Sequence, residues 1–300
     1  MATGSTLITG ASGFVGAPAL GHLVGAGHDV HALSTRPQPP IDGVTWHQGD
    51  LLQAGAAEAL VASMRPERLL HLAWYAEPGR FWDSPENLRW VEATLRLLRA
   101  FADTGGRRAV LAGTCAEYEW SAGGVCSEDE TPLRPATLYG ASKDATRRVA
   151  RAFAETAGFE LAWGRIFFLY GPREPPQRLL PLVTKALLSG EPARVTEGTQ
   201  VRDFMHVDDV ARAFVEVLDS EIRGAVNIAS GTGVELRELV QLAGAAAGRP
   251  ELIELGAIPQ RPGEPAVLVA DIDRLHRIGF RPRHGLTDGV SETVEWWRSR

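Results

Sequence analysis

The stretch Thr6-Leu-Ile-Thr-Gly10-Ala-Ser-Gly13-Phe-Val-Gly16 decides the fold. Its short apolar run is typical of a β-strand, and a glycine loop follows at once. Glycines here allow a tight turn and let the backbone approach a pyrophosphate at the amino terminus of the next helix. The spacing is GxxGxxG rather than GxGxxG, and an ordinary strand-to-helix turn is the alternative. Because the loop directly follows the first strand, we expect a dinucleotide site.

Short apolar runs alternate with helical patterns over the first half of the chain, as in the βαβ units of a parallel sheet. Helices are expected at Leu88–Ala102 and Tyr139–Glu155, the second preceded by prolines that suit a helix start. The pattern predicts an α/β fold with a Rossmann-type, doubly wound parallel sheet. The expected strands are Thr6–Thr9, Asp29–Leu33, Arg68–Leu72, Arg108–Ala112 and Glu160–Arg165.

After Gly171-Pro172 the alternation loosens and Pro-rich stretches appear, which predicts a smaller carboxy-terminal substrate lobe. Ala225–Ala229 has a strand-like pattern and is expected to return to the main sheet, so that the two lobes interleave. The expected dinucleotide-binding domain comprises residues 1–170 plus about 201–232. The substrate lobe comprises about 171–200 plus 233–300.

Composition describes an ordinary globular chain of 300 residues with 44% hydrophobic and 23% charged residues. A net charge of -6 without a Lys/Arg block gives no reason to expect nucleic-acid or membrane binding. The cysteines are Cys115 and Cys126, which argues against a disulfide scaffold and fits a reducing cytosol. We find no signal peptide and no apolar run of membrane-spanning length, so a cytoplasmic location is expected.

Thr114, Tyr139 and Lys143 carry the chemistry that we expect. Residues four apart share a helix face, so the phenol of Tyr139 and the ammonium of Lys143 point the same way. A nearby cation favours the ionised phenol and is expected to lower its pKa toward neutrality. Tyr139 is then a proton donor or acceptor for a carbonyl/alcohol interconversion, and Thr114 adds a hydrogen bond to the same substrate oxygen.

Other reactive residue types have ordinary explanations. His206 and the Asp208/Asp209 pair resemble metal ligands, but the chain supplies no further well-spaced ligands, and no metal is expected. Cys115 has no evident histidine partner and is interpreted as a small buried thiol. No GxSxG elbow occurs, which leaves a serine hydrolase without support.

The end of the second strand is expected to select the dinucleotide. An NAD site normally places an acidic residue there, whereas this chain has Ser34-Thr35-Arg36. Hydroxyls and a guanidinium suit a 2'-phosphate, so NADP(H) is favoured and NAD(H) remains possible. Arg36 at the start of a solvated loop is the alternative. Asp50-Leu51 follows a third short strand, where either an adenine contact or a turn Asp is expected.

The sequence resembles the nucleotide-sugar epimerase, dehydratase and reductase branch of the extended short-chain dehydrogenase/reductase family, over nearly its whole length. Besides the glycine loop and the Thr/Tyr/Lys set, the shared motifs are His71-Leu-Ala73, Arg165 through Tyr170-Gly-Pro172, Arg202-Asp-Phe-Met-His-Val-Asp-Asp209, Asn227-Ile-Ala-Ser-Gly231 and Arg261-Pro-Gly-Glu264 followed by Asp271.

The resemblance implies that Arg202 and Arg261 grip a substrate diphosphate, a task that suits guanidinium groups. Taken together, the sequence arguments place the dinucleotide against Gly10, Ser12, Gly13, Phe14, Val15, Gly16, Ser34, Thr35, Arg36, Asp50, Leu51, Leu72, Ala73, Trp74, Tyr139 and Lys143. They place the substrate against Tyr75, Trp82, Cys115, Ala116, Phe168, Arg202 and Arg261.

Departures from the family pattern narrow the activity. The dehydratases follow their Thr with an Asp-Glu pair that performs the elimination, whereas Cys115-Ala116 follows Thr114 here and Glu117 comes one place late, so dehydration is disfavoured. Phe168 replaces the usual Asn before Tyr-Gly-Pro, which alters the grip on the diphosphate. Trp74 replaces a small residue, and with Trp82 and Tyr75 it indicates an aromatic sugar pocket or a stiffened loop.

These features favour an NADPH-dependent reductase of a nucleotide-linked 4-keto-deoxysugar, with a dTDP-linked substrate expected. In this interpretation Tyr139 protonates the nascent alkoxide. The first alternative is an NAD-dependent nucleotide-sugar 4-epimerase, and a non-catalytic NADP-binding regulator is the second. The resemblance also implies a homodimer that packs Leu88–Ala102 and Tyr139–Glu155 of each chain into a four-helix bundle.

Overall fold

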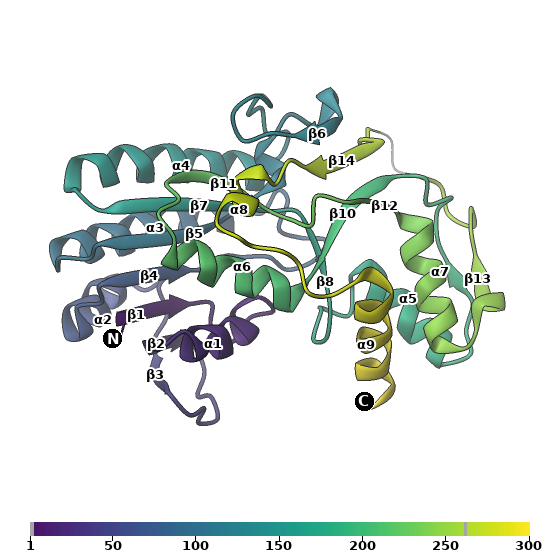
Figure 1. Cartoon of the computed structure of the whole chain (residues 1–300), viewed down its shortest axis with the longest axis horizontal. Helices are drawn as coiled ribbons and strands as arrows, with labels where there is room; N and C mark the ends of the chain where they lie inside the picture. The colour runs from purple at the N-terminus through teal and green to yellow at the C-terminus, as the bar shows by residue number, and fades with distance from the viewer. Residues whose placement is uncertain (1–2, 261–262) are drawn as a thin grey trace.

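The computed structural model describes residues 3–260 and 263–300, and a parallel sheet forms its larger part (Figure 1). Within the described residues seven strands form this sheet in the order β11-β7-β5-β4-β1-β2-β3, with every neighbouring pair parallel. Their bounds are β1 Thr3–Thr9, β2 His28–Ser34, β3 Val44–Gln48, β4 Arg68–His71, β5 Arg108–Thr114, β7 Glu160–Ile166 and β11 Gly224–Ile228. The order reverses between β1 and β4, where open α/β sheets bind ligands beyond the carboxyl ends of the strands.

Helices cover both faces of this sheet. α1 (Gly16–Gly25) packs against α6 (Val207–Asp219) on one face, and α3 (Glu86–Asp103) packs between α2 (Ala56–Met64) and α4 (Leu138–Ala157) on the other. Successive strand residues enter opposite cores: Ile8 packs on the α1/α6 side and Leu7 on the α3 side. β5 is buried along its whole length, and burial on both faces explains its nearly continuous run of small and apolar residues.

A second sheet lies to the right of the main sheet in Figure 1. β10 (Val201–His206) pairs with β12 (Gly233–Glu235), β14 (Val267–Ala270) and β8 (Phe168–Tyr170), and β14 also pairs with β6 (Gly124–Cys126). β9 (Ala193–Arg194) and β13 (Ile253–Glu254) form a separate pair. The remaining helices are α5 Leu179–Leu188, α7 Leu236–Ala247, α8 Asp273–Arg277 and α9 Leu286–Arg298, with short 3-10 turns η1 Cys115–Glu117, η2 Trp120–Ala122 and η3 Pro250–Leu252.

Local chemistry fixes the ends of the helix that carries Tyr139. The Thr137 side chain accepts a hydrogen bond from the Gly140 N–H and caps the start of α4. Gly158 ends α4 in the left-handed conformation. Gly140 also lies against the carbonyl oxygen of Ala116, because a Cβ there would come within 2.3 Å of that atom. The start of α4 is therefore held against the turn that follows β5.

The structure confirms the doubly wound parallel sheet and the return of residues 225–229, as β11, to it. The five expected strands appear within one to a few residues of their predicted ends, and both expected helices are present as α3 and α4. The division into two domains stays a prediction. β10 lies in the second sheet, whereas the following helix α6 packs on the main sheet.

Candidate active site

The glycine loop makes the close approach that its sequence indicates. Gly10 follows β1 with φ +70°, and a Cβ there would come within 2.7 Å of the Ala73 nitrogen. A Cβ on Gly16 would come within 2.0 Å of the Gly10 carbonyl oxygen. The loop therefore packs against the end of β4 and leads directly into α1, as a pyrophosphate-binding turn requires.

A cavity of about 970 Å³ runs from this loop across the carboxyl ends of the main strands to β10 of the smaller lobe. Its volume is at the upper end of the usual range for ligand sites, about 300–1,000 Å³. The walls include nearly all residues expected to contact the dinucleotide: Gly10, Ser12, Gly13, Phe14, Val15, Gly16, Ser34, Thr35, Asp50, Leu51, Leu72, Ala73, Trp74, Tyr139 and Lys143.

Thr114, Tyr139 and Lys143 line this same cavity. Thr114 ends β5, and Tyr139 and Lys143 project from the first turns of α4. The Thr114 oxygen accepts a hydrogen bond from the Ala116 N–H, which leaves its own hydrogen free to donate. Phe81 and Trp82 meet the Tyr139 ring edge to face and fix its orientation.

The expected lowering of the Tyr139 pKa is wrong for this structure. Burial is the largest influence and raises the pKa above its ordinary value, although a hydrogen bond with Thr114 opposes the change. Lys143 directs its ammonium elsewhere: Nζ donates to the Ala112 carbonyl oxygen at 2.8 Å. The phenol is therefore in its neutral form, ready to donate a proton.

Burial also acts on Lys143 and lowers its pKa to about 7. The ammonium lies 3.8 Å from the centre of the Trp74 ring, and the buried Glu117 partly opposes the lowering. Trp74 is itself anchored, because its indole N–H donates to the Asn87 side chain at 2.8 Å. An aromatic wall thus stands beside the catalytic lysine where the family pattern has a small residue.

A buried carboxylate holds the turn that follows Thr114. Glu117 is fully buried and accepts hydrogen bonds from the Thr114 backbone N–H at 2.9 Å and the Trp163 indole at 2.8 Å. Its other oxygen pairs with Arg165 at 2.8 Å. Sequence analysis noted this acid only as displaced from the dehydratase position. In the structure, Glu117 holds the turn after Thr114 in place through the hydrogen bond that it accepts from the Thr114 N–H.

The same hydrogen-bond network continues to the second sheet. Arg165 donates to the Tyr118 hydroxyl at 3.0 Å, and that hydroxyl donates to Asn227 at 2.7 Å. The Asn227 amide then donates to the carbonyl oxygens of Cys126 and Asp271, which lie at the ends of β6 and β14. Buried polar side chains therefore connect the catalytic turn to the second sheet.

The end of β2 presents hydroxyl groups to the cavity. Ser34 is buried there and accepts hydrogen bonds from the Arg36 N–H and the Gln38 amide. Thr35 also lines the cavity, whereas the Arg36 side chain is exposed and is not part of the wall. A contact between Arg36 and a 2'-phosphate stays a prediction.

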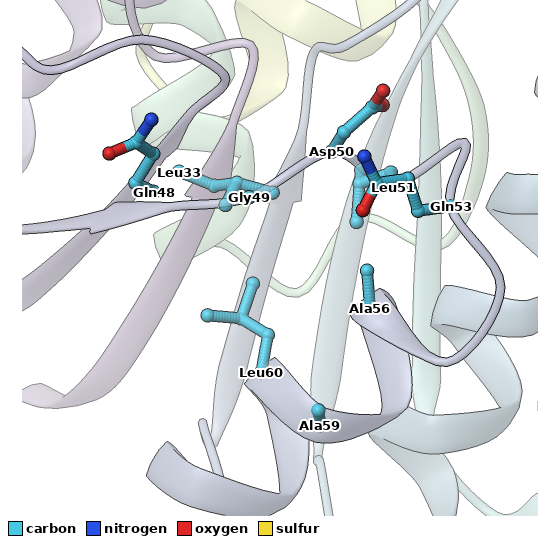
Figure 2. Close-up of a pocket in the computed structure, with 9 residues that line it drawn as sticks. All are labelled: Leu33, Gln48, Gly49, Asp50, Leu51, Gln53, Ala56, Ala59 and Leu60. Atoms are coloured by element: carbon cyan, nitrogen blue, oxygen red, sulfur yellow. The ribbon is translucent and has the colours of Figure 1, made fainter.

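A smaller hollow of about 400 Å³ adjoins the dinucleotide end of the cavity (Figure 2). Leu33, Gly49, Asp50 and Leu51 line both spaces. Asp50 accepts a hydrogen bond from the Leu52 N–H at 2.9 Å, as expected of an aspartate in a turn. Figure 2 shows its carboxylate directed away from Ala56 and Ala59 on α2.

Most expected substrate residues also line the cavity, namely Trp82, Cys115, Ala116, Phe168 and Arg202. The Arg202 guanidinium lies 5.5 Å from the centre of the Phe168 ring. Tyr75 does not line the cavity and donates instead to Glu77. Arg261 lies outside the described residues.

Sequence analysis missed several residues of the substrate end. Trp120 lines the cavity and donates its indole N–H to the Cys115 carbonyl oxygen at 2.9 Å. Glu174 and Arg178 line it from the turn between β8 and α5. This turn lies in the Pro172–Pro176 stretch, where a charged residue among prolines was the available signal.

Among the described residues, 3–260 and 263–300, no group of three or more His, Cys, Asp or Glu side chains is arranged to hold a metal ion. No helix in that part of the chain has the length and apolar character needed to cross a bilayer.

The sequence model of the NAD dependent epimerase/dehydratase family matches residues 6–229. The chain belongs to this family. The matched region contains the glycine loop, Thr114, Tyr139 and Lys143, and the expected place in the nucleotide-sugar branch of the extended short-chain dehydrogenase/reductases is confirmed.

Relatives in this family match over nearly their full lengths. UDP-glucose 4-epimerase of Mycolicibacterium smegmatis is 28% identical over 98% of this chain and 99% of the relative. dTDP-glucose 4,6-dehydratase of Streptomyces griseus is 31% identical over 97% and 93%. The structure of MoeE5 in complex with UDP-glucuronic acid and NAD is 34% identical, covers 99% of both chains and superimposes with a TM-score of 0.84. A second MoeE5 structure contains UDP-glucose and NAD.

Proposed function

We propose that this protein is an NAD-dependent 4-epimerase of a nucleotide sugar. The observation that carries the proposal is that Thr114, Tyr139 and Lys143 share one cavity with the glycine loop and Arg202. Full-length similarity to UDP-glucose 4-epimerases supports it. The sequence alone favoured a 4-ketoreductase, and the relatives shift the preference to the epimerase that was its alternative.

The residues of the cavity fit a dinucleotide, because the loop at Gly10 and Gly16 leaves no room for side chains between α1 and the end of β4. The dinucleotide, when bound, supplies the hydride acceptor and donor for the sugar carbon. The loop backbone and Ser12 hold its phosphates, and Lys143 holds the nicotinamide ribose. These contacts assign binding roles to the residues that line the glycine-loop end.

Proton transfer falls to Tyr139. Its hydroxyl oxygen receives a proton from the C4 hydroxyl during oxidation and returns it during reduction. The Thr114 hydroxyl, which is hydrogen bonded with Tyr139 in this structure, forms a hydrogen bond with the same substrate oxygen when substrate is bound and positions it. Because the phenol is neutral in this structure, it must release its own proton to solvent before it can act as the base, and a cation beside it in the loaded site lowers its pKa so that it does. Lys143 is that cation, after its ammonium leaves the Ala112 carbonyl.

Dehydration is not proposed, because the two positions after Thr114 lack acids. Cys115 is buried, and burial raises the pKa of its thiol well above the ordinary value. Ala116 has no titratable group. The nearest acid, Glu117, is held by Arg165 and Trp163 away from the role of a mobile proton donor.

The second candidate is the NADPH-dependent 4-ketoreductase, with a dTDP-linked keto-deoxysugar as substrate. The observation that favours it is the end of β2, where Ser34 and Thr35 face the cavity in place of the acid of an NAD site. MoeE5 with bound NAD favours the epimerase instead. UDP-linked hexoses are therefore the first substrates to test, with Arg202 and Arg261 expected at the diphosphate.

The deciding experiment begins with protein purified without added cofactor, then denatured to release any nicotinamide nucleotide. An epimerase regenerates its cofactor in each cycle and can retain NAD, whereas a reductase must exchange it. Stoichiometric NAD and interconversion of UDP-glucose and UDP-galactose support the epimerase. A cofactor-free protein that consumes NADPH with a dTDP-linked 4-keto sugar overturns it. A Tyr139→Phe variant should bind dinucleotide and lose turnover.

A homodimer is part of this proposal. Leu88 on α3 and Val149 on α4 are large apolar side chains with exposed fractions of 59% and 51%. Because α3 and α4 pack side by side on one face of the sheet, two copies can bury these residues in a four-helix bundle. Light scattering should give twice the chain mass of 32.4 kDa. A Leu88→Glu, Val149→Glu variant should give the monomer mass.

A further inference from the structure

One carboxyl group on the cavity wall has no role in the mechanism above. Glu174 has an exposed fraction of only 4%, yet it lines the cavity. Its Oε2 atom has no hydrogen-bond partner among the described residues. Buried carboxyl groups are normally hydrogen bonded, so an unsatisfied one beside a ligand cavity needs an explanation.

The local backbone directs this side chain inward. Glu174 lies in the turn between β8 and α5, and its N–H donates to the Gly171 carbonyl oxygen at 3.2 Å. The preceding Arg173 has φ +71°, a left-handed conformation that residues other than glycine rarely adopt. Arg173 is exposed while Glu174 is buried, so the turn separates the two charges. Strained backbone of this kind is concentrated at ligand sites.

Glu174 and Arg178 line the cavity from one turn, and Tyr139 lines the same cavity. The Arg178 guanidinium lowers the pKa of Glu174. Burial outweighs it for Glu174 and raises that pKa to about 8. The other charged groups on the cavity walls are Lys143 on α4, Asp50 after β3, Arg202 on β10 and Glu264 before β14.

We propose that Glu174 is a specificity-determining residue that accepts a hydrogen bond from a sugar hydroxyl and, in its ionised form, disfavours sugars that carry a carboxylate. The inference rests on the proposed nucleotide-sugar substrate and adds which sugars are accepted. A hydroxyl donor supplies the partner that Oε2 lacks. A sugar carboxylate placed beside the ionised Glu174 meets a like charge in a partly desolvated site, which opposes binding.

The test compares UDP-glucose, UDP-glucuronic acid and UDP by titration calorimetry on NAD-saturated protein. A Tyr139→Phe background prevents turnover during the measurement. Both sugar nucleotides contain UDP, so changes in protonation that affect only the binding of UDP cancel in the ratio of the two dissociation constants. At about pH 9 Glu174 is ionised, and the ratio for UDP-glucuronic acid over UDP-glucose should exceed its value at about pH 6.5 by about tenfold.

Glu174→Gln keeps the shape of the side chain and removes the charge. In this variant we expect the ratio to change by less than about twofold between the two pH values, with UDP affinity unaltered. Glu264→Gln is the matched control, because Glu264 lines the same cavity but is already bonded to Gln200. The pH dependence should survive in this control.

Three outcomes overturn the inference. The first is a ratio that does not depend on pH in protein with unmodified Glu174, and the second is loss of the pH dependence in Glu264→Gln. The third is a loss of UDP affinity in Glu174→Gln as large as its loss of UDP-glucose affinity, which places Glu174 beside the nucleotide base. If neither UDP-sugar binds, both this inference and the proposed function fall. If both bind with the expected ratios but unmodified protein turns neither over, only the proposed epimerase activity falls.

Discussion

The ammonium of Lys143 lies 3.8 Å from the centre of the Trp74 ring, on the wall of the cavity that contains the glycine loop. The ring and the Ala112 carbonyl oxygen are the close partners of this cation, and Glu117 acts on it from a greater distance. Burial without a paired anion lowers the lysine pKa to about 7. Trp74 therefore controls how much water reaches the ammonium.

Replacing Trp74 with Ala should raise the pKa of Lys143 from about 7 toward its ordinary value of 10.5, because water then solvates the ammonium. Lys143 and Lys185 are the only lysines in the chain, so NMR of 13C-labelled lysine resolves both. The Lys185 signal is the internal reference. Trp90→Ala is the control, since Trp90 packs on Trp74 at 6.3 Å. An unchanged Lys143 titration in Trp74→Ala contradicts the assignment.

Replacing Glu117 with Gln should destabilise the fold by about 3 kcal/mol, because Arg165 loses its buried anion. The glutamine oxygen can still accept from Thr114, but its NH₂ group faces the Arg165 donor. Urea unfolding measures the change. Glu119→Gln is the matched control two residues away, where the partner Arg134 is exposed and an effect of about 0.5 kcal/mol or less is expected. Equal losses of unfolding free energy in the two variants contradict a stabilising role for the buried Glu117–Arg165 pair.

Replacing Ser34 with Asp should weaken NADPH binding by at least about tenfold and leave NAD binding nearly unaltered, since an acid at this position repels a 2'-phosphate and accepts from the ribose hydroxyl. Fluorescence titration with each nucleotide gives the affinities. Arg36→Ala separates the candidate functions: unchanged NADPH affinity agrees with the exposed side chain, and a large loss supports the ketoreductase.

His71 should make the protein acid-sensitive below about pH 6.5. Burial lowers its folded-state pKa to about 3, from 6.5, so between these values the unfolded chain binds a proton that the folded chain does not. Stability is therefore lost as pH falls through this range. At pH 5 the loss relative to His71→Gln should be about 2 kcal/mol, from urea unfolding at pH 5 and 7.5. The prediction is contradicted if the unfolding free energies of the unmodified protein and of His71→Gln change equally between these pH values.

The main sheet was predictable because short apolar runs such as Leu7-Ile8 and Leu69-Leu70, which are buried in the structure, alternate with helical patterns. Strands of the second sheet were not: β6, β8 and β12 are three residues each and pair between distant segments. In segments so short, two-residue periodicity hardly appears. Their pairing is decided by tertiary contacts such as those of Asn227 with Cys126 and Asp271.

The meeting of Thr114, Tyr139 and Lys143 at one cavity was predictable because Tyr139 and Lys143 are one helical turn apart and Thr114 ends a strand. Their electrostatics were not, since the pKa values depend on burial that spacing does not show. Glu174 was missed for a similar reason. Its inward direction depends on the left-handed backbone of Arg173, an arginine that the sequence gives no reason to place there.

The hydrogen-bonded path from Glu117 through Arg165, Tyr118 and Asn227 limits how this enzyme can be recombined with its relatives. A chimera that takes the segment after Tyr170 from another family member draws Asn227 and Asp271 from one parent and Tyr118 and Cys126 from the other. Such a hybrid leaves the Tyr118 hydroxyl or the Asn227 amide without a fitted partner beneath the catalytic turn. New sugar preferences are therefore better introduced by single changes at the cavity wall than by exchange of the whole lobe.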